Sequence, residues 1–224
     1  MTRPAHSHQP GPILPPVMAP QQLGNLDSIT DSERNALRPI GSTAREIALR
    51  TGGLLADLAA LPGVLIFQAV QPADADIPRV PHVMSAGRRV VLVESVAWPP
   101  GAYDTTDDGR IHCDGVYIGQ SVRPLLTALL YWRKTLPQDH GVCAVVVVHP
   151  VSDGLLSLPT TRMRAITWTS ADNAVHVILH QFFAGRRAAS PKVLRTLAAA
   201  SGGPCRDTAV ANRASSAVPD AWAL

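Results

Sequence analysis

The fold is decided by residues 88–96, which read Arg-Arg-Val-Val-Leu-Val-Glu-Ser-Val. Because the apolar residues stand at consecutive positions, both faces of the strand that they form must be covered. Such a strand is typical of the middle of a sheet with helices on both sides. Near its end it carries Glu94, and a buried carboxylate is costly unless it is paired, protonated or bound to a metal. The stretch therefore predicts a central strand with a chemically unusual residue near its exit.

The elements around this strand predict an α/β domain. Apolar residues recur at helical spacing from Gly41, with Ser42 as the expected N-cap, until Pro62-Gly63 stops the helix. Further helices are expected over 120–136, 172–183 and 190–200, and strands over 64–67, 79–84, 88–96, 143–148 and 164–168. This order of elements, with short strands inserted around residues 107–110, predicts a mixed central sheet flanked by helices.

The two ends of the chain differ in composition from this middle part. Seven of the first 20 residues are prolines or glycines. We expect residues 1–38 to form a disordered, proline-rich arm, in which Thr30 and Glu33 have the spacing of a capping box. Residues 39–200 are expected to form the domain, and residues 201–224 a flexible tail.

Composition limits the classes of function. The 224 residues include 20 basic and 17 acidic side chains, a formal charge of +3 that does not by itself argue for nucleic-acid binding. Only two of the basic residues are lysines; arginine suits phosphate contacts, although a GC-rich genome gives the same bias. The three cysteines lack CxxC spacing, which argues against a disulfide framework or a zinc site. With neither a signal peptide nor an apolar run of about 20 residues, we expect a cytoplasmic protein that does not enter a membrane.

The order and spacing of several short motifs carry a resemblance to a known family. The motifs are Gly41–Glu46 with its glutamate, Val80-Pro81-His82-Val83, Val90–Val96, the turn at Tyr103–Gly109, the helix beginning at Gln120, and the strand Ala144–Val148. Over residues 41–198 the chain resembles the nuclease-related NERD domain, a branch of the PD-(D/E)XK restriction-endonuclease-like superfamily. The resemblance implies a restriction-endonuclease-like fold.

The resemblance also implies which residues carry the chemistry. In that superfamily an aspartate and a glutamate at adjacent strand ends bind Mg²⁺, which polarises the phosphodiester and helps to generate hydroxide. A lysine two residues after the glutamate lies on the same strand face and orients the attacking water. In this chain the glutamate position is Glu94, whereas the aspartate position falls on Pro81 and the lysine position on Val96. Glu46 and Glu94 remain as vestigial catalytic candidates.

These departures imply a catalytically degenerate domain that needs no cofactor and binds nucleic acid or a protein partner rather than cleaving DNA. Two alternatives stay open. The first is an active Mg²⁺-dependent nuclease with a rearranged site, in which Asp76 and Glu94 hold the metal. The second is a protein-interaction scaffold that does not bind nucleic acid.

Two arginine pairs are candidates for nucleic-acid contact. Arg88-Arg89 lies at the expected hairpin and Arg186-Arg187 near the end of the domain, and solvated surface is the other interpretation of both. The sequence contains no GxSxG elbow, GxGxxG loop or GxxxxGK[ST] loop, which argues against a serine hydrolase or a nucleotide hydrolase. Partner identity and oligomeric state stay open at this point.

Overall fold

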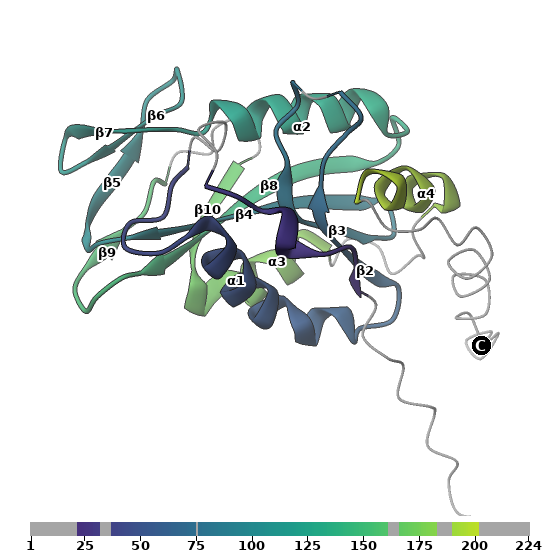
Figure 1. Ribbon diagram of the computed structural model, residues 1–224, viewed down its shortest axis with the longest axis horizontal. Helices are drawn as coiled ribbons and strands as arrows, with labels where there is room; N and C mark the ends of the chain where they lie inside the picture. The colour runs from purple at the N-terminus through teal and green to yellow at the C-terminus, as the bar shows by residue number, and fades with distance from the viewer. Residues whose placement is uncertain (1–21, 32–36, 75, 161–165, 183–189, 202–224) are drawn as a thin grey trace, which may run out of the picture.

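A computed structural model shows how these elements are arranged (Figure 1). The structure describes residues 22–31, 37–74, 76–160, 166–182 and 190–201. Within these ranges it contains two β-sheets and four α-helices, so the predicted mixed α/β class is confirmed. None of the helices in the described ranges has both the length and the apolar character that a membrane crossing requires.

The larger sheet has six strands in the order β1-β2-β3-β4-β8-β10. Their bounds are Gln22–Leu23 (β1), Val64–Val70 (β2), Val80–Ala86 (β3), Arg89–Trp98 (β4), Gly141–Pro150 (β8) and Ile166–Ser170 (β10). Strand β3 runs antiparallel to its neighbours β2 and β4, whereas the pairs β1–β2, β4–β8 and β8–β10 are parallel. The sheet is therefore mixed, and β4 has an antiparallel neighbour on one side and a parallel neighbour on the other.

Helices cover both faces of this sheet (Figure 1). Side chains of α1 (Ala44–Ala59) and α3 (Ala171–Phe182) pack with Val91 and Val93 on one face. Side chains of α2 (Arg123–Thr135) and α4 (Pro191–Ala200) pack with Val90 and Leu92 on the other. The apolar residues of β4 thus enter two separate cores, as the unbroken apolar run of that strand predicted.

The smaller sheet has four strands in the order β7-β6-β5-β9 and lies at the end of the molecule away from α4 (Figure 1). Its strands are Gly101–Thr105 (β5), Arg110–Cys113 (β6), Val116–Ser121 (β7) and Leu156–Ser157 (β9). A side chain from β7 connects it to the larger sheet, because Oε1 of Gln120 accepts a hydrogen bond of 3.1 Å from the indole N–H of Trp98. The ring of Trp98 also stacks on Tyr103 of β5, with centroids 4.3 Å apart.

Part of the segment predicted to be a disordered arm is ordered, so that prediction is wrong for residues 22–31. Strand β1 pairs in parallel with β2, and a short 3-10 helix, η1 (Leu26–Ser28), follows it. Leu26 and Ile29 are buried in a small cluster with Ala48 of α1 and Ala69 of β2. These apolar residues have no regular spacing, which is why the sequence pattern did not reveal them. Glu33 of the predicted capping box falls outside the described residues, as does the 201–224 tail apart from residue 201.

Two expected helix starts are displaced. The N-cap of α1 is Thr43 rather than Ser42, and its hydroxyl accepts a hydrogen bond from the Glu46 amide. Helix α2 begins at Arg123 rather than at position 120, because Gln120 and Ser121 still belong to β7. Pro124 in the first turn suits this later start, since proline there gives up an amide that has no helical partner.

Candidate functional site

The larger sheet opens between β3 and β4 beside Glu94. The last residues paired across these strands are His82 and Val93. The same register would place Pro81 opposite Glu94, but proline has no amide hydrogen to donate to a neighbouring strand. Beyond this point β3 stays paired with β2, and β4 stays paired with β8 as far as Trp98. The end of the β3–β4 pairing therefore coincides with Pro81.

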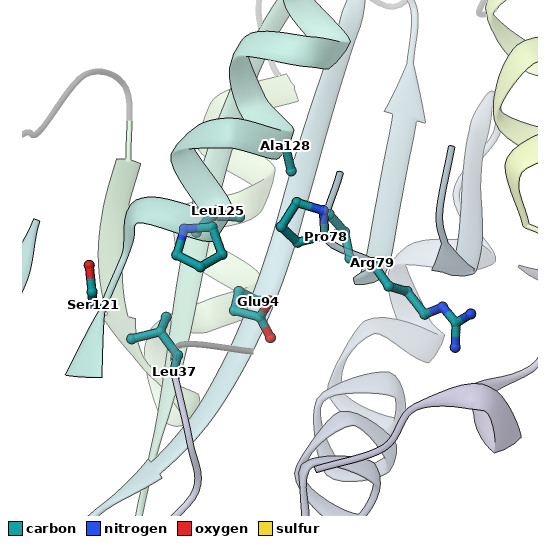
Figure 2. A pocket seen from close by; sticks show the side chains of 9 residues that line it. Leu37, Pro78, Arg79, Glu94, Ser121, Leu125 and Ala128 are labelled. Carbon is teal, nitrogen blue, oxygen red and sulfur yellow. The ribbon is translucent and has the colours of Figure 1, made fainter. Parts of the chain in front are cut away.

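A hollow forms at this opening, and we call it the Glu94 hollow. Its residues come from the segment before β3, from β4, from the end of β7 and from α2, with one from the segment before α1. They are Leu37, Pro78, Arg79, Val80, Glu94, Ser121, Pro124, Leu125 and Ala128. Figure 2 shows the Glu94 side chain in the middle of this group. The free space within the hollow is about that of one water molecule.

Glu94 has one hydrogen-bond donor among the described residues. Its Oε1 accepts from the amide of the next residue, Ser95, at 3.0 Å. The side chain is half-buried, and its loss of hydration raises the pKa of Glu94 to about 8, while the Ser95 amide opposes the shift. The surroundings of Glu94 therefore favour its protonated, uncharged form.

Arg79 lines the same hollow but does not neutralise Glu94. Its two terminal nitrogens donate to the carbonyl of Ser28 and to Oε1 of Gln71, the latter at 2.6 Å. Figure 2 shows its guanidinium group directed away from the Glu94 carboxyl. Arg79 thus links the last residue of η1 to the loop between β2 and β3. Both of its acceptors are uncharged, and its Nε has no hydrogen-bond partner among the described residues.

The residues around Glu94 do not fit a Mg²⁺ site. Magnesium prefers several oxygen ligands, usually ionised carboxylates and waters. The other lining residues offer no second carboxylate, and the environment of Glu94 favours its protonated form. Asp76 is exposed in the loop before β3, where its amide donates to Oδ1 of Asp74, and it does not line the hollow. Throughout the described ranges, no group of three or more His, Cys, Asp or Glu side chains is arranged to hold a metal.

Glu46 lies at the exposed N-terminus of α1, not in the Glu94 hollow. Its Oε2 accepts a hydrogen bond of 2.8 Å from the amide of Thr43, which completes a capping box. This backbone hydrogen bond is the main reason that the pKa of Glu46 is lowered, with smaller contributions from the Thr43 hydroxyl and the charge of Arg50. Its contacts explain Glu46 as a residue that stabilises the start of a helix.

The arginine pair at the hairpin lies at the start of β4, whereas Glu94 is near the middle of that strand. Arg88 and Arg89 are both exposed, and Arg88 forms an ion pair of 3.5 Å with Asp139. Because both partners are well exposed, this pair contributes little to stability. Arg186 and Arg187 lie outside the described residues.

A second polar group, under α1, was not predicted from the sequence. On this face of the sheet, Oγ1 of Thr51 lies 2.7 Å from Nε2 of His149, and both side chains are buried. His82 is fully buried, and its Nε2 lies 2.9 Å from the carbonyl oxygen of Ala48. Nδ1 of His82 and Oγ of Ser95 have no hydrogen-bond partner among the described residues. Thr51 and His149 are 98 residues apart, so no local spacing could have revealed the pair.

Comparison with known proteins identifies no relative: no family model, curated protein or solved structure matches this chain. Its function is therefore inferred from the residues and contacts described above.

Proposed function

We propose that this chain is a catalytically inactive, nuclease-related domain that acts by binding a partner. One observation carries the proposal: Glu94, the carboxylate that the family chemistry would use, lies in a largely apolar hollow whose other lining residues include no second carboxylate. Metal-assisted cleavage needs an ionised ligand set and a group that orients water. Pro81 and Val96 supply neither, and the raised pKa of Glu94 favours the neutral acid.

A protein partner is the ligand that the surface supports best. Large apolar side chains are exposed on the smaller sheet and beside it, with Val116 at 67% and Leu155 at 85% exposure. Exposed apolar groups of this kind contribute to protein interfaces and are of little use against a phosphate backbone.

Nucleic acid is the second candidate, and the exposed arginines 88 and 89 favour it. Arginine binds phosphate through paired hydrogen bonds, and Arg89 has no ion pair among the described residues. The ion pair between Arg88 and Asp139 reduces the charge that this end of the sheet presents.

The catalytic part of the proposal is tested by incubating supercoiled plasmid with the full chain and Mg²⁺ or Mn²⁺. We expect no nicking above a buffer control, and the Glu94→Ala variant should behave in the same way. Robust nicking by the wild type that Glu94→Ala abolishes would overturn the proposal and favour the active nuclease, for which Asp76→Ala is the next variant.

The choice of ligand is tested by electrophoretic mobility shifts with duplex DNA over a series of salt concentrations. A protein-binding domain should show no specific retardation at physiological salt. A nucleic-acid binder should show an affinity that falls steeply as salt rises, and an Arg88→Ala/Arg89→Ala double variant should flatten that slope. A steep salt dependence that the double variant flattens would identify nucleic acid, rather than a protein, as the partner.

A further inference from the structure

An N-terminal strap, which we define as residues 22–31, lies against the edge of β2 and the first turns of α1 (Figure 1). Its pairing with β2 spans two residues, and its apolar contacts form the small cluster that contains Leu26 and Ile29. The ion pair between Asp27 and Arg45 is exposed on both sides, so it contributes little to holding the strap. Local opening of the strap should therefore cost less free energy than unfolding of the central sheet.

Arg79 connects this strap to the Glu94 hollow. Its terminal nitrogens donate to the carbonyl oxygen of Ser28 in the strap and to Oε1 of Gln71, and its side chain also lines the hollow. Both acceptors are uncharged, and among the described residues Arg79 forms no ion pair and its buried Nε has no partner. A guanidinium gains more from an ionised carboxylate, which it can bind through two parallel hydrogen bonds, than from such acceptors.

Glu94 can supply that carboxylate from within the same hollow. A carboxylate has about four acceptor positions, and among the described residues the Ser95 amide occupies one of them. The other lining residues, which come from the segments before α1 and β3, the start of β3, the end of β7, and α2, are uncharged: Leu37, Pro78, Val80, Ser121, Pro124, Leu125 and Ala128. Arg79 is therefore the one cation that this lining offers to an ionised Glu94.

We propose that Arg79 is a switch between two acceptors: it holds the strap through Ser28 while Glu94 is neutral, and it turns to the Glu94 carboxylate once that group is ionised. Arg79 is already part of the wall, so this change needs a rotation of its own side chain and no group has to enter the hollow. The structure shows the first position, with the guanidinium directed away from Glu94 (Figure 2).

The switch sets the direction in which pH acts on the strap. Because burial raises the pKa of Glu94 to about 8, the carboxyl stays neutral in acid and becomes ionised as the pH rises through that value. The strap should therefore be held in acid and loosen in base. Coupling of this kind is reciprocal, so a strap that is loosened by other means should favour the ionised form of Glu94.

The first experiment follows the strap by hydrogen exchange in the full chain. The buried amide of Ile29, which donates to the carbonyl of Leu26 at 3.0 Å, is the reporter, and its protection factor removes the intrinsic pH dependence of exchange. Between about pH 6 and about pH 9 we expect this factor to fall about tenfold or more, since an opposite charge lowers the pKa of a carboxyl group by about 1–3 units. An unchanged factor in the wild type would overturn the proposal.

Two variants identify the groups responsible. Glu94→Gln keeps the shape of the neutral side chain but cannot ionise, so the protection factor of Ile29 should stay high and constant over the same interval. Arg79→Gln removes the link to Ser28, so the factor should be lower at every pH but again constant. If the factor of either variant falls with pH as it does in the wild type, the switch does not exist.

The second experiment tests the reciprocal effect by following the Glu94 carboxyl carbon by NMR in ¹³C-glutamate-labelled protein. Leu26→Ala loosens the strap without altering the lining of the hollow, and it should lower the titration midpoint of Glu94 by about half a pH unit or more. Leu155→Ala, the same change at a site that is 85% exposed, should leave the midpoint unchanged.

The Arg79→Gln background then decides whether the coupling runs through this arginine. There, Leu26→Ala should no longer move the midpoint of Glu94. A midpoint that Leu26→Ala does not move in the wild type, or moves equally in the Arg79→Gln background, would overturn the proposal.

Discussion

The two faces of the larger sheet differ in how far solvent reaches their polar side chains. On the α2 and α4 face, Glu94 lies in a hollow that solvent reaches. On the α1 and α3 face, His82 and the Thr51–His149 pair are buried beneath a helix. The same sheet thus carries one polar group that an outside ligand can reach and others that serve only the protein's own packing.

The two faces should also respond to pH in opposite directions. Burial lowers the pKa of His82 to about 4, so the stability that neutral His82 contributes is complete above about 6.5 and is lost as the pH falls through 4. Burial raises the pKa of Glu94 to about 8, so the stability that its protonated form contributes is complete below about 4.5 and is lost as the pH rises through 8. Acid should therefore destabilise the α1 and α3 face, which we call the covered face. Base should destabilise the α2 and α4 face, which we call the open face.

The largest expected change in stability comes from Trp98, which lies on the open face. It tests whether this face, apart from the Glu94 hollow, is as well packed as the covered face. Trp98 is fully buried, stacks on Tyr103 and Trp168, and donates to Gln120. Trp98→Ala should lower the free energy of unfolding by about 3–5 kcal/mol in urea denaturation. A Tyr117→Ala control on the exposed surface should change it by less than about 0.5 kcal/mol. Similar values for the two variants would show that the open face is loosely packed throughout.

The second prediction concerns the loss of stability that buried His82 on the covered face should cause in acid. Relative to a His82→Gln variant, the wild type should lose on the order of 3 kcal/mol of unfolding free energy between pH 6.5 and pH 4, because the folded protein resists protonation of His82. His149, whose pKa burial also lowers, is present in both proteins and cancels in the difference. Parallel stability curves for the two proteins would contradict the buried, neutral state of His82.

Glu94 on the open face should cause a smaller loss of stability, and this loss should occur as the pH rises rather than as it falls. Relative to Glu94→Gln, the wild type should lose on the order of 2 kcal/mol between pH 4.5 and pH 8, a value reduced by the partial exposure of the side chain. Chemical denaturation at several pH values measures it. A stability difference that is constant over this interval would mean that Glu94 is ionised throughout, and the case against a metal site would lose its electrostatic support.

The smallest effect isolates one hydrogen bond on the covered face. Thr51→Val keeps the branched shape of the side chain but removes the hydroxyl that lies 2.7 Å from Nε2 of His149. We expect a loss of about 1 kcal/mol, and Thr51→Ser, which keeps the hydroxyl, should lose less. If Thr51→Val is as stable as the wild type, solvent reaches His149 and the contrast between the two faces is weaker than described.

Much of the larger sheet could be predicted from the sequence because its signals are local. The unbroken apolar run around Leu92 predicted a central strand, and β4 occupies that place between β3 and β8. Helix starts were less accurate, since Ser42 and Thr43 are both good caps and only the contact with Glu46 selects the second. Strand β1 and η1 were not predicted, because their short apolar segments are stabilised by residues distant in sequence, such as Ala69.

The candidate site was predictable in part. Sequence position alone placed Glu94 on a central strand and Pro81 beside it, as the continuation of the His82–Val93 register indicates. The hollow was not predictable, because its walls come from Leu37, from the end of β7 and from α2, which meet only in the folded chain. The restriction-endonuclease-like character of the fold and the loss of nuclease activity stay predictions.

The hydrogen bonds of the Gln120 side chain limit where residues can be inserted into or deleted from this chain. Its amide accepts from Trp98 and from the Arg38 backbone amide, and donates to the Arg38 carbonyl, which ties three separate parts of the chain together. Since successive side chains of a strand point to opposite faces, inserting one residue between Val116 and Gln120 would turn this amide away from all its partners. Over evolutionary time, homologues should therefore gain and lose residues at the exposed positions 151–153 while the residue count of β7 stays constant.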